Sequence, residues 1–137
     1  MKRIKVLIVD DSALVRKMLN EILNSDPGID VVGVAQDPYI AREKIKELSP
    51  DVLTLDVEMP RMDGLEVLDR VRQNHADLPV IILTASTNRA IAEGSLDRGA
   101  TAYLLKPFDP EHLRQTVFDA LGIESPDGSG SGAGAAT

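Results

Sequence analysis

Apolar residues along this chain form short continuous runs that alternate with stretches of helical spacing. The runs are rich in β-branched residues and nearly uninterrupted, which is typical of strands buried on both faces of a parallel sheet. We expect strands at residues 4–9, 31–35, 52–56, 80–84 and 102–105. After each of them, apolar residues recur three or four positions apart, as on the buried face of a helix.

Capping residues support the predicted helices. Ser12 suits the start of the first helix, while Asp37-Pro38 and Asp109-Pro110 each combine an acidic cap with a proline at the first helical position. Gly99 and Gly122 suit helix ends in the left-handed conformation. Strands that alternate with helices in this way predict an α/β protein, a doubly wound parallel sheet with helices on both faces and right-handed crossovers.

Composition narrows the class of protein. The chain has 137 residues, 43% of them hydrophobic but only 3% aromatic, so we expect one domain with an aliphatic core. It has no cysteine, which excludes disulfides, thiolate metal sites and cysteine nucleophiles. The net charge of −7 argues against a nucleic-acid partner and gives no signal for an anionic membrane surface.

Two further expectations concern location and domain boundaries. No apolar run approaches the roughly 20 residues of a membrane span, so we expect a soluble, cytoplasmic protein. The folded domain is expected at residues 1–122. Residues 123–137, which are rich in glycine, serine and alanine, are expected to be a flexible tail or linker.

Reactive side chains stand at the carboxyl ends of four of the predicted strands. Asp10 and Asp11 follow the first strand, Asp56 ends the third, Thr84 ends the fourth and Lys106 follows the fifth. All strands of a parallel sheet point their carboxyl ends at the same edge, where ligands of such sheets bind. We therefore expect three carboxylates, one hydroxyl and one ammonium around a single crevice.

This combination of groups favours phosphoryl transfer. Three neighbouring carboxylates repel one another unless they share a cation, and oxygen ligands suit Mg²⁺. Lys106 supplies a positive charge and Thr84 a hydrogen-bond donor for phosphate oxygens. An aspartate can act as the nucleophile and form an aspartyl-phosphate. The chain has no glycine-rich phosphate cradle, so we do not expect it to bind a nucleotide in that way.

Each of these residues has a simpler explanation when taken alone. Asp10 and Asp11 could cap a helix, Thr84 could be an ordinary strand end, and Lys106 could lie on the surface before a turn. The occurrence of one suitable group at each strand end favours the functional interpretation. Glu58 is expected to be a loop acid whose backbone carbonyl is a better metal ligand than its side chain.

Four segments together resemble the receiver domain of two-component response regulators, the CheY-like superfamily. They are VLIVDDS at residues 6–12, LDVEMPRMDG at residues 55–64, Thr84-Ala85 and Lys106-Pro107. The resemblance covers about residues 1–122. It implies a flavodoxin-like (βα)5 three-layer sandwich with sheet order 2-1-3-4-5.

The resemblance also implies roles for the acids. Asp56 is the expected phosphoacceptor, with a histidine kinase as donor. Mg²⁺ is the expected cofactor, held by Asp10, Asp11 and Asp56 together with the backbone carbonyl of Glu58, and Asp11 is its direct ligand. Glu58 also falls at a position thought to tune the dephosphorylation rate in this family.

Three other residues are implied to report phosphorylation. Thr84 moves toward the phosphoryl group, Lys106 pairs with it, and Tyr103 swings inward. The resemblance also implies a cis peptide bond between Lys106 and Pro107. The face made by the fourth helix, fifth strand and fifth helix is the expected contact for a downstream effector protein. We therefore expect a switch that assists its own phosphoryl transfer and dephosphorylation and is not a separate enzyme.

Two biological settings remain open. Residues 50–64, with Asp11-Ser12-Ala13 and Asp37-Pro38, are similar to the receiver domain of chemotaxis methylesterases. Thr84–Thr87, Phe108 and the full fifth helix are more similar to stand-alone chemotaxis receivers. The chain is thus interpreted as a chemotaxis-type switch or, alternatively, as the N-terminal regulatory domain of a protein-glutamate methylesterase separated from its catalytic domain.

Two other classes are less consistent with the sequence. A haloacid-dehalogenase-like phosphatase also uses an aspartate nucleophile with Mg²⁺, but requires a second aspartate where this chain has Glu58. A receiver-like module that binds partners without phosphate is disfavoured by the complete set of acids.

Overall fold

The computed structural model describes residues 3–59 and 62–123 of the chain. The described residues form a five-stranded parallel sheet in the order β2-β1-β3-β6-β7. The strands are β1 (Ile4–Val9), β2 (Ile29–Ala35), β3 (Val52–Asp56), β6 (Val80–Ala85) and β7 (Ala102–Lys106). If only the five strands of this sheet are numbered along the chain, their order is 2-1-3-4-5, which confirms the flavodoxin-like topology.

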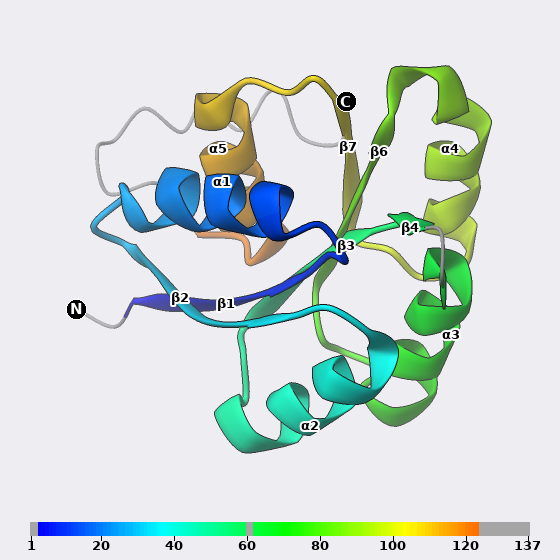
Figure 1. The fold of residues 1–137 in the computed structure, drawn as a ribbon, viewed down its shortest axis with the longest axis horizontal. Helices are drawn as coiled ribbons and strands as arrows, with labels where there is room; N and C mark the ends of the chain where they lie inside the picture. The colour runs from blue at the N-terminus through cyan, green and yellow to red at the C-terminus, as the bar shows by residue number, and fades with distance from the viewer. Residues whose placement is uncertain (1–2, 60–61, 124–137) are drawn as a thin grey trace.

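Helices cover both faces of the sheet and produce three layers (Figure 1). One face is covered by α1 (Ala13–Asn24) and α5 (Pro110–Ala120). The opposite face is covered by α2 (Pro38–Leu48), α3 (Gly64–Asn74) and α4 (Arg89–Asp97). The predicted three-layer sandwich is therefore confirmed.

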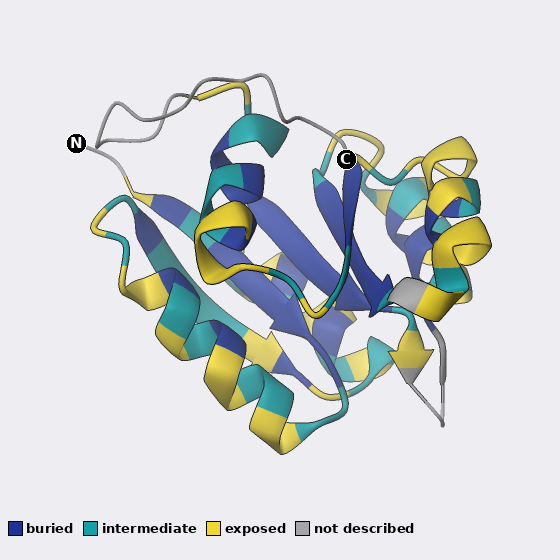
Figure 2. Cartoon of the chain, turned by 90° about the horizontal axis from the view of Figure 1, so that it is seen from above, coloured by how far each residue is buried: buried dark blue, intermediate teal, exposed yellow. Residues whose placement is uncertain are grey.

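The two faces have separate aliphatic cores because successive side chains of a strand point to opposite faces. In β1, Val6 and Ile8 pack on the side of α1 and α5, while Leu7 and Val9 pack on the side of α2, α3 and α4. Strands β1, β3, β6 and β7 are accordingly buried along most of their length, whereas most residues of the edge strand β2 are only half-buried (Figure 2). Burial on both faces explains why the strand sequences are continuous apolar runs.

The predicted caps are present. Ser12 accepts a hydrogen bond from the backbone N–H of Val15 at 3.2 Å, and Asp37 accepts one from Ile40 at 2.8 Å. Asp109 likewise accepts from the N–H of Glu111 at 2.9 Å. Each cap satisfies one backbone donor that the first turn of a helix leaves unpaired.

Three short elements were not predicted. A two-stranded antiparallel hairpin, β4 (Glu58–Met59) with β5 (Met62–Asp63), follows Asp56, and a 3-10 turn, η1 (Ser86–Asn88), precedes α4. Strands of two residues and a helix of one turn are too short to produce a hydrophobic period. The second strand also begins at Ile29, two residues earlier than expected.

Gly64, the first residue of α3, lies against the backbone at the end of β3. A Cβ added at Gly64 would lie 2.4 Å from the Cα of Val57 and 3.0 Å from the carbonyl oxygen of Asp56. Glycine is therefore required at this position by the close approach of two backbone segments. None of the helices in the described ranges is both long enough and apolar enough to span a membrane.

Candidate functional site

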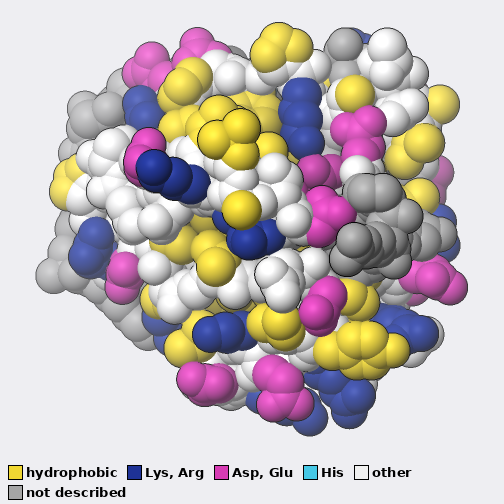
Figure 3. Space-filling model, viewed as in Figure 1, with side chains coloured by type: hydrophobic (Ala, Val, Ile, Leu, Met, Phe, Trp, Pro, Cys, Tyr) yellow, Lys and Arg dark blue, Asp and Glu magenta, His cyan; other side chains and the backbone are white. Residues whose placement is uncertain are grey.

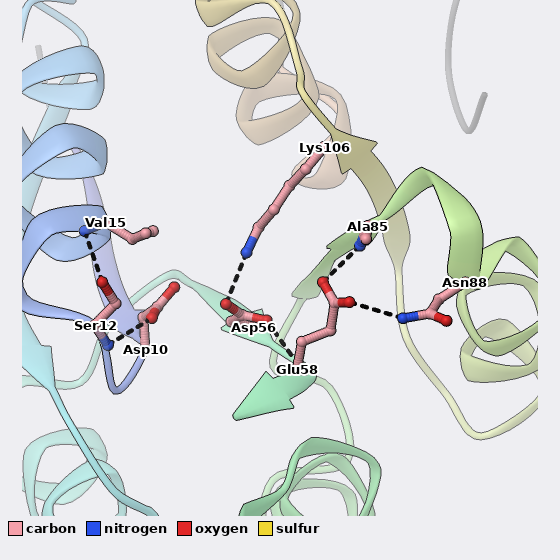
Figure 4. A network of polar contacts seen from close by, with 8 residues as sticks. All are labelled: Asp10, Ser12, Val15, Asp56, Glu58, Ala85, Asn88 and Lys106. Atoms are coloured by element: carbon pink, nitrogen blue, oxygen red, sulfur yellow. Dashed lines mark hydrogen bonds and ion pairs between the residues drawn. The ribbon is translucent and has the colours of Figure 1, made fainter. Parts of the chain in front are cut away.

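The sheet brings the ends of four strands to one edge. β3 lies between β1 and β6, so Asp10 after β1 and Thr84 near the end of β6 flank Asp56. β7 lies on the other side of β6 and ends at Lys106, which pairs with Ala85 in the sheet register. Of the side chains that the sequence predicted at this edge, those of Asp10, Asp56 and Lys106 lie around one crevice in Figure 4.

Lys106 and Asp56 form an ion pair across this crevice. The Nζ of Lys106 lies 2.8 Å from Oδ2 of Asp56, and the other carboxylate oxygen accepts a hydrogen bond from the N–H of Glu58 at 2.7 Å. Asp56 is only 5% exposed. A buried carboxylate needs such partners, because loss of its hydration is otherwise unfavourable.

Asp10 is fully buried beside this pair. Its Oδ1 accepts a hydrogen bond from the N–H of Ser12 at 2.9 Å. Its Oδ2 has no hydrogen-bond partner among the residues that the structure describes. Burial, followed by the nearby carboxylate of Asp56, raises the pKa of Asp10 from 3.8 to about 6, although the Ser12 hydrogen bond and Lys106 act in the opposite direction.

The unpartnered Oδ2 of Asp10 and the adjacent carboxylate of Asp56 suit a small divalent cation. Mg²⁺ is commonly held by one or two carboxylates and keeps several waters. Asp11 follows Asp10 and is half-buried. Within residues 3–59 and 62–123, no three His, Cys, Asp or Glu side chains are grouped as a metal site, so the full ligand set stays a prediction.

Thr84 and Tyr103, which were expected to act in switching, are both buried. The hydroxyl of Thr84 has no hydrogen-bond partner within the described part of the chain. Tyr103 is 8% exposed and packs in the core on the side of α2, α3 and α4. The switching roles of both residues stay predictions. The Lys106–Pro107 peptide bond is cis, as the resemblance implied.

The carboxylate of Glu58 has partners that the sequence did not reveal. Its Oε1 accepts a hydrogen bond from the backbone N–H of Ala85 at 2.6 Å. Its Oε2 accepts one from the side-chain amide of Asn88 at 2.7 Å. These partners lie 27 and 30 residues away, so the only sequence signal was an acid two positions after Asp56.

The fold and this crevice define the class of protein. It is a flavodoxin-like α/β protein in which two buried aspartates and a lysine meet at the carboxyl edge of the sheet. Ligand sites of doubly wound sheets lie at this edge, where the strand order reverses.

Comparison with known proteins identifies the family. Residues 6–118 match the response regulator receiver domain, and the chain belongs to this family. It is 53% identical over 124 residues to a protein-glutamate methylesterase/protein-glutamine glutaminase of Hydrogenovibrio crunogenus, covering 88% of this chain and 33% of that protein. A protein of the same description from Xanthomonas campestris pv. campestris is 54% identical over 106 residues, covering 76% of this chain and 29% of that protein.

Solved structures agree with this assignment. The response regulator domain of Thermotoga maritima CheB is 34% identical with a TM-score of 0.80, covering 90% of this chain and 99% of that chain. The CheX-CheY-BeF3-Mg+2 complex from Borrelia burgdorferi includes a chain with 31% identity and a TM-score of 0.79, covering 88% of this chain and 90% of that chain.

The chain spans about a third of the length of the curated relatives it matches. Close homologues are thus the receiver domains of methylesterases, and the catalytic part of those proteins is not in this chain. Of the two settings left open by the sequence, these matches favour the regulatory domain of a methylesterase over a stand-alone receiver.

Proposed function

We propose that Asp56 accepts a phosphoryl group from a histidine kinase in a Mg²⁺-dependent reaction. The observation that carries this proposal is the ion pair between Lys106 and the buried Asp56, with the second buried carboxylate of Asp10 beside it. A nucleophilic carboxylate close to a fixed cation is suited to a reaction that depends on positioning and charge neutralisation.

In the transfer, an oxygen of Asp56 forms a bond to phosphorus while the bond from phosphorus to the donor nitrogen breaks. The electron pair of that bond stays on the histidine of the kinase. Lys106 already lies 2.8 Å from Asp56, where its ammonium can pair with an oxygen of the incoming phosphoryl group. The hydroxyl of Thr84, which has no hydrogen-bond partner among the described residues, can donate to another phosphoryl oxygen.

Asp10, Asp11 and Asp56, with the backbone carbonyl of Glu58, would hold the Mg²⁺ ion. When bound, the ion neutralises charge on the carboxylates and on the phosphoryl oxygens. Asp10 contributes its Oδ2, which accepts no hydrogen bond from any described residue, while its Oδ1 accepts one from Ser12. The residues available therefore fit the cofactor expected from the sequence.

Phosphorylation is proposed to act as a switch. It adds about −1.5 to −2 charges at Asp56, which draws Thr84 and Lys106 toward the phosphoryl group. Tyr103 lies in the core behind these residues and is proposed to report the change to the face formed by α4, β7 and α5. That face would contact the downstream effector, and the cytoplasm, where a kinase can reach it, is the proposed location.

The test is phosphorylation by acetyl phosphate, read by intact mass. We expect an adduct on wild type only with Mg²⁺, and none on Asp56→Asn. Asp97→Asn, a change of the same kind at an exposed aspartate of α4, should retain the adduct. An adduct on Asp56→Asn, or equal adducts with and without Mg²⁺, would contradict the proposal.

The comparisons support a second, more specific proposal, that this receiver regulates a methylesterase catalytic domain. It rests on identity over 88% of this chain to a methylesterase/glutaminase. The test replaces the matching segment of the Hydrogenovibrio protein with this chain and measures methyl ester hydrolysis. We expect acetyl phosphate to change the activity of this fusion and to have no effect when it carries Asp56→Asn. If acetyl phosphate changes methyl ester hydrolysis in neither fusion, this role would be excluded.

A further inference from the structure

A groove lies between α2 and α3, on the side of the sheet opposite α1 and α5. Its volume is about 630 Å³. Clefts of about 300–1,000 Å³ are usual for bound ligands. Its lining comes from residues 38–46 of α2 and residues 67–75 of α3, and each of these stretches corresponds to about 13 Å of helix. No residue of the crevice around Asp56 is among the described residues that line it.

The floor of the α2–α3 groove is apolar. Ala41 and Ile45 of α2, with Val67 and Val71 of α3, line the groove and belong to the core on this side of the sheet. Tyr39 borders this floor and is 74% exposed. A large aromatic side chain in water beside apolar surface gains stability when a partner covers both. The groove therefore offers apolar area that the described part of the chain leaves uncovered.

Three cations border the same groove. Arg42 and Lys46 stand one helical turn apart on α2, and Arg70 lies on α3. All three are exposed, and none forms an ion pair or a side-chain hydrogen bond with another described residue. The described lining residues include no acid. In a chain with a net charge of −7, this is a local concentration of positive charge that would attract an anionic partner.

The surface view agrees with this description. Figure 3 shows yellow hydrophobic side chains next to dark blue Lys and Arg side chains at the lower right, where Figure 1 draws α2 beside α3. An apolar centre with a polar, charged rim is the usual organisation of a protein–protein interface. Tyrosine and arginine are also the residue types that most often dominate binding energy in such interfaces.

A small phosphate-bearing ligand is less suited to this groove. Phosphates are commonly bound by the backbone N–H groups at a helix N-terminus. At the start of α2 the carboxylate of Asp37 already accepts a hydrogen bond from the N–H of Ile40 at 2.8 Å, and it adds a negative charge there. The cations are instead distributed along α2 and across to α3. This distribution suits several separate carboxylates better than one phosphate group.

We propose that the α2–α3 groove binds an acidic amphipathic helix of a partner protein. The apolar side chains of that helix would cover the floor of the groove, and its Asp and Glu side chains would pair with Arg42, Lys46 and Arg70. A helix of about three turns matches the length of the groove. This binding would not depend on phosphorylation of Asp56, because the crevice and the groove share no described residue.

The first test is an NMR titration of the isotopically labelled protein with synthetic peptides. The acidic peptide has about 14 residues, with leucines at helical spacing and glutamates and alanines at the other positions. One control peptide carries lysine in place of every glutamate, and a second carries serine in place of every leucine. We expect the acidic peptide to bind at least about tenfold more tightly than either control and to shift the amide signals of α2 and α3.

Variants at the rim test the predicted contacts. Arg42→Glu and Arg70→Glu reverse one charge on each helix, and each should weaken binding of the acidic peptide about three- to tenfold. Lys17→Glu, at an exposed position of α1, changes the net charge by the same amount and should leave the affinity within about twofold of wild type. Tyr39→Ser removes the aromatic border and should weaken binding about threefold. All four variants should keep the melting temperature of wild type within a few degrees, because the side chains are exposed.

The possible results distinguish an amphipathic partner from general attraction of anions. If the serine-substituted peptide binds as tightly as the acidic amphipathic one, the groove attracts anions only and the proposal is overturned. Equal affinity for the lysine peptide, amide shifts confined to α1 or α4, or equal weakening by Lys17→Glu and Arg42→Glu would also overturn it. The absence of binding at millimolar peptide would have the same consequence. The phosphoacceptor role of Asp56 is measured separately by the acetyl phosphate adduct, which the groove variants should retain.

Discussion

The ammonium of Lys106 and the carboxylate of Asp56 form an ion pair with an N–O distance of 2.8 Å, at the ends of strands that are not adjacent in the sheet. The Asp56 side chain is 6% exposed and that of Lys106 is 29% exposed. The lysine therefore crosses the end of β6 to reach the acid. Asp10 is buried on the other side of Asp56, after β1. The charge of Lys106 therefore limits the repulsion between the carboxylates of Asp10 and Asp56.

Removal of the Lys106 charge should destabilise the protein when no divalent cation is present. Lys106→Gln leaves Asp56 buried without its cation, and we expect the free energy of unfolding to fall by about 1–3 kcal/mol near neutral pH, less than for a fully buried pair. Urea denaturation measures the change, with Lys17→Gln on the exposed surface of α1 as control. Equal losses in the two variants would show that the ion pair adds nothing specific.

Asp10 should make stability depend on pH. Its pKa is raised from 3.8 to about 6, so the folded state binds a proton there more readily than the unfolded chain does. The stability gained from this proton is fully present below the pKa that Asp10 has in the unfolded chain. It is lost as the pH rises through the pKa of Asp10 in the folded protein. We expect Asp10→Asn to raise the melting temperature by several degrees at about pH 7.5, and by much less at about pH 4.

The same substitution separates stability from metal binding. The amide oxygen of Asn can keep the hydrogen bond from Ser12, but it brings no charge for a cation. Millimolar Mg²⁺ should raise the melting temperature of wild type and not that of Asp10→Asn, and its effect on wild type should weaken below about pH 6 as Asp10 gains a proton. A Mg²⁺ effect that survives in Asp10→Asn would remove Asp10 from the proposed ligand set.

Thr84 offers a test in which stability and function respond differently. Its buried hydroxyl has no partner among the described residues, so Thr84→Val should leave the free energy of unfolding within about 1 kcal/mol of wild type or raise it. The proposed switch should nevertheless be weakened, because the donor for the phosphoryl group is lost. The NMR signals of Tyr103 on addition of beryllofluoride and Mg²⁺ measure this, with Tyr39, which is 74% exposed, as internal reference. An unchanged Tyr103 response would exclude Thr84 from the switch.

Gly64 should be intolerant of any side chain. A Cβ there would lie 2.4 Å from the Cα of Val57, and only backbone movement next to Asp56 could relieve the contact. Gly64→Ala is expected to lower the free energy of unfolding by about 3 kcal/mol and to slow phosphorylation. Gly94→Ala is the matched control, because a Cβ in this part of α4 meets nothing within 4 Å and should stabilise the helix by up to about 1 kcal/mol.

Arg72 fixes the end of α3 away from the site. Its guanidinium donates hydrogen bonds to the carbonyl oxygens of Gly99 at 2.7 Å, Leu78 at 2.6 Å and His75 at 3.0 Å. Lysine cannot reproduce this fork, so Arg72→Lys should lower the free energy of unfolding by about 1–3 kcal/mol. Arg70→Lys, at an exposed position of the same helix, should have little effect, and phosphorylation of both variants should proceed as in wild type.

The sequence by itself determined the sheet, its helices and the chemical groups at the site. Strands β1, β3, β6 and β7 are buried along most of their length and are nearly continuous apolar runs because both of their faces are covered. The caps at Ser12, Asp37 and Asp109 are local signals that the structure reproduces. Because parallel strands end at one edge, the approximate meeting of Asp10, Asp56, Thr84 and Lys106 also followed from their positions in sequence.

Only the tertiary structure decided which of these groups are paired and which are not. The raised pKa of Asp10 and the contact of Lys106 with Asp56 depend on burial and on distances between strands, which a linear pattern does not contain. The same is true of the Thr84 hydroxyl, which is buried without a hydrogen-bond partner in the described part of the chain. The same holds for the carboxylate of Glu58, whose partners are 27 and 30 residues away, and for the hairpin at β4 and β5, whose strands are too short to show a period.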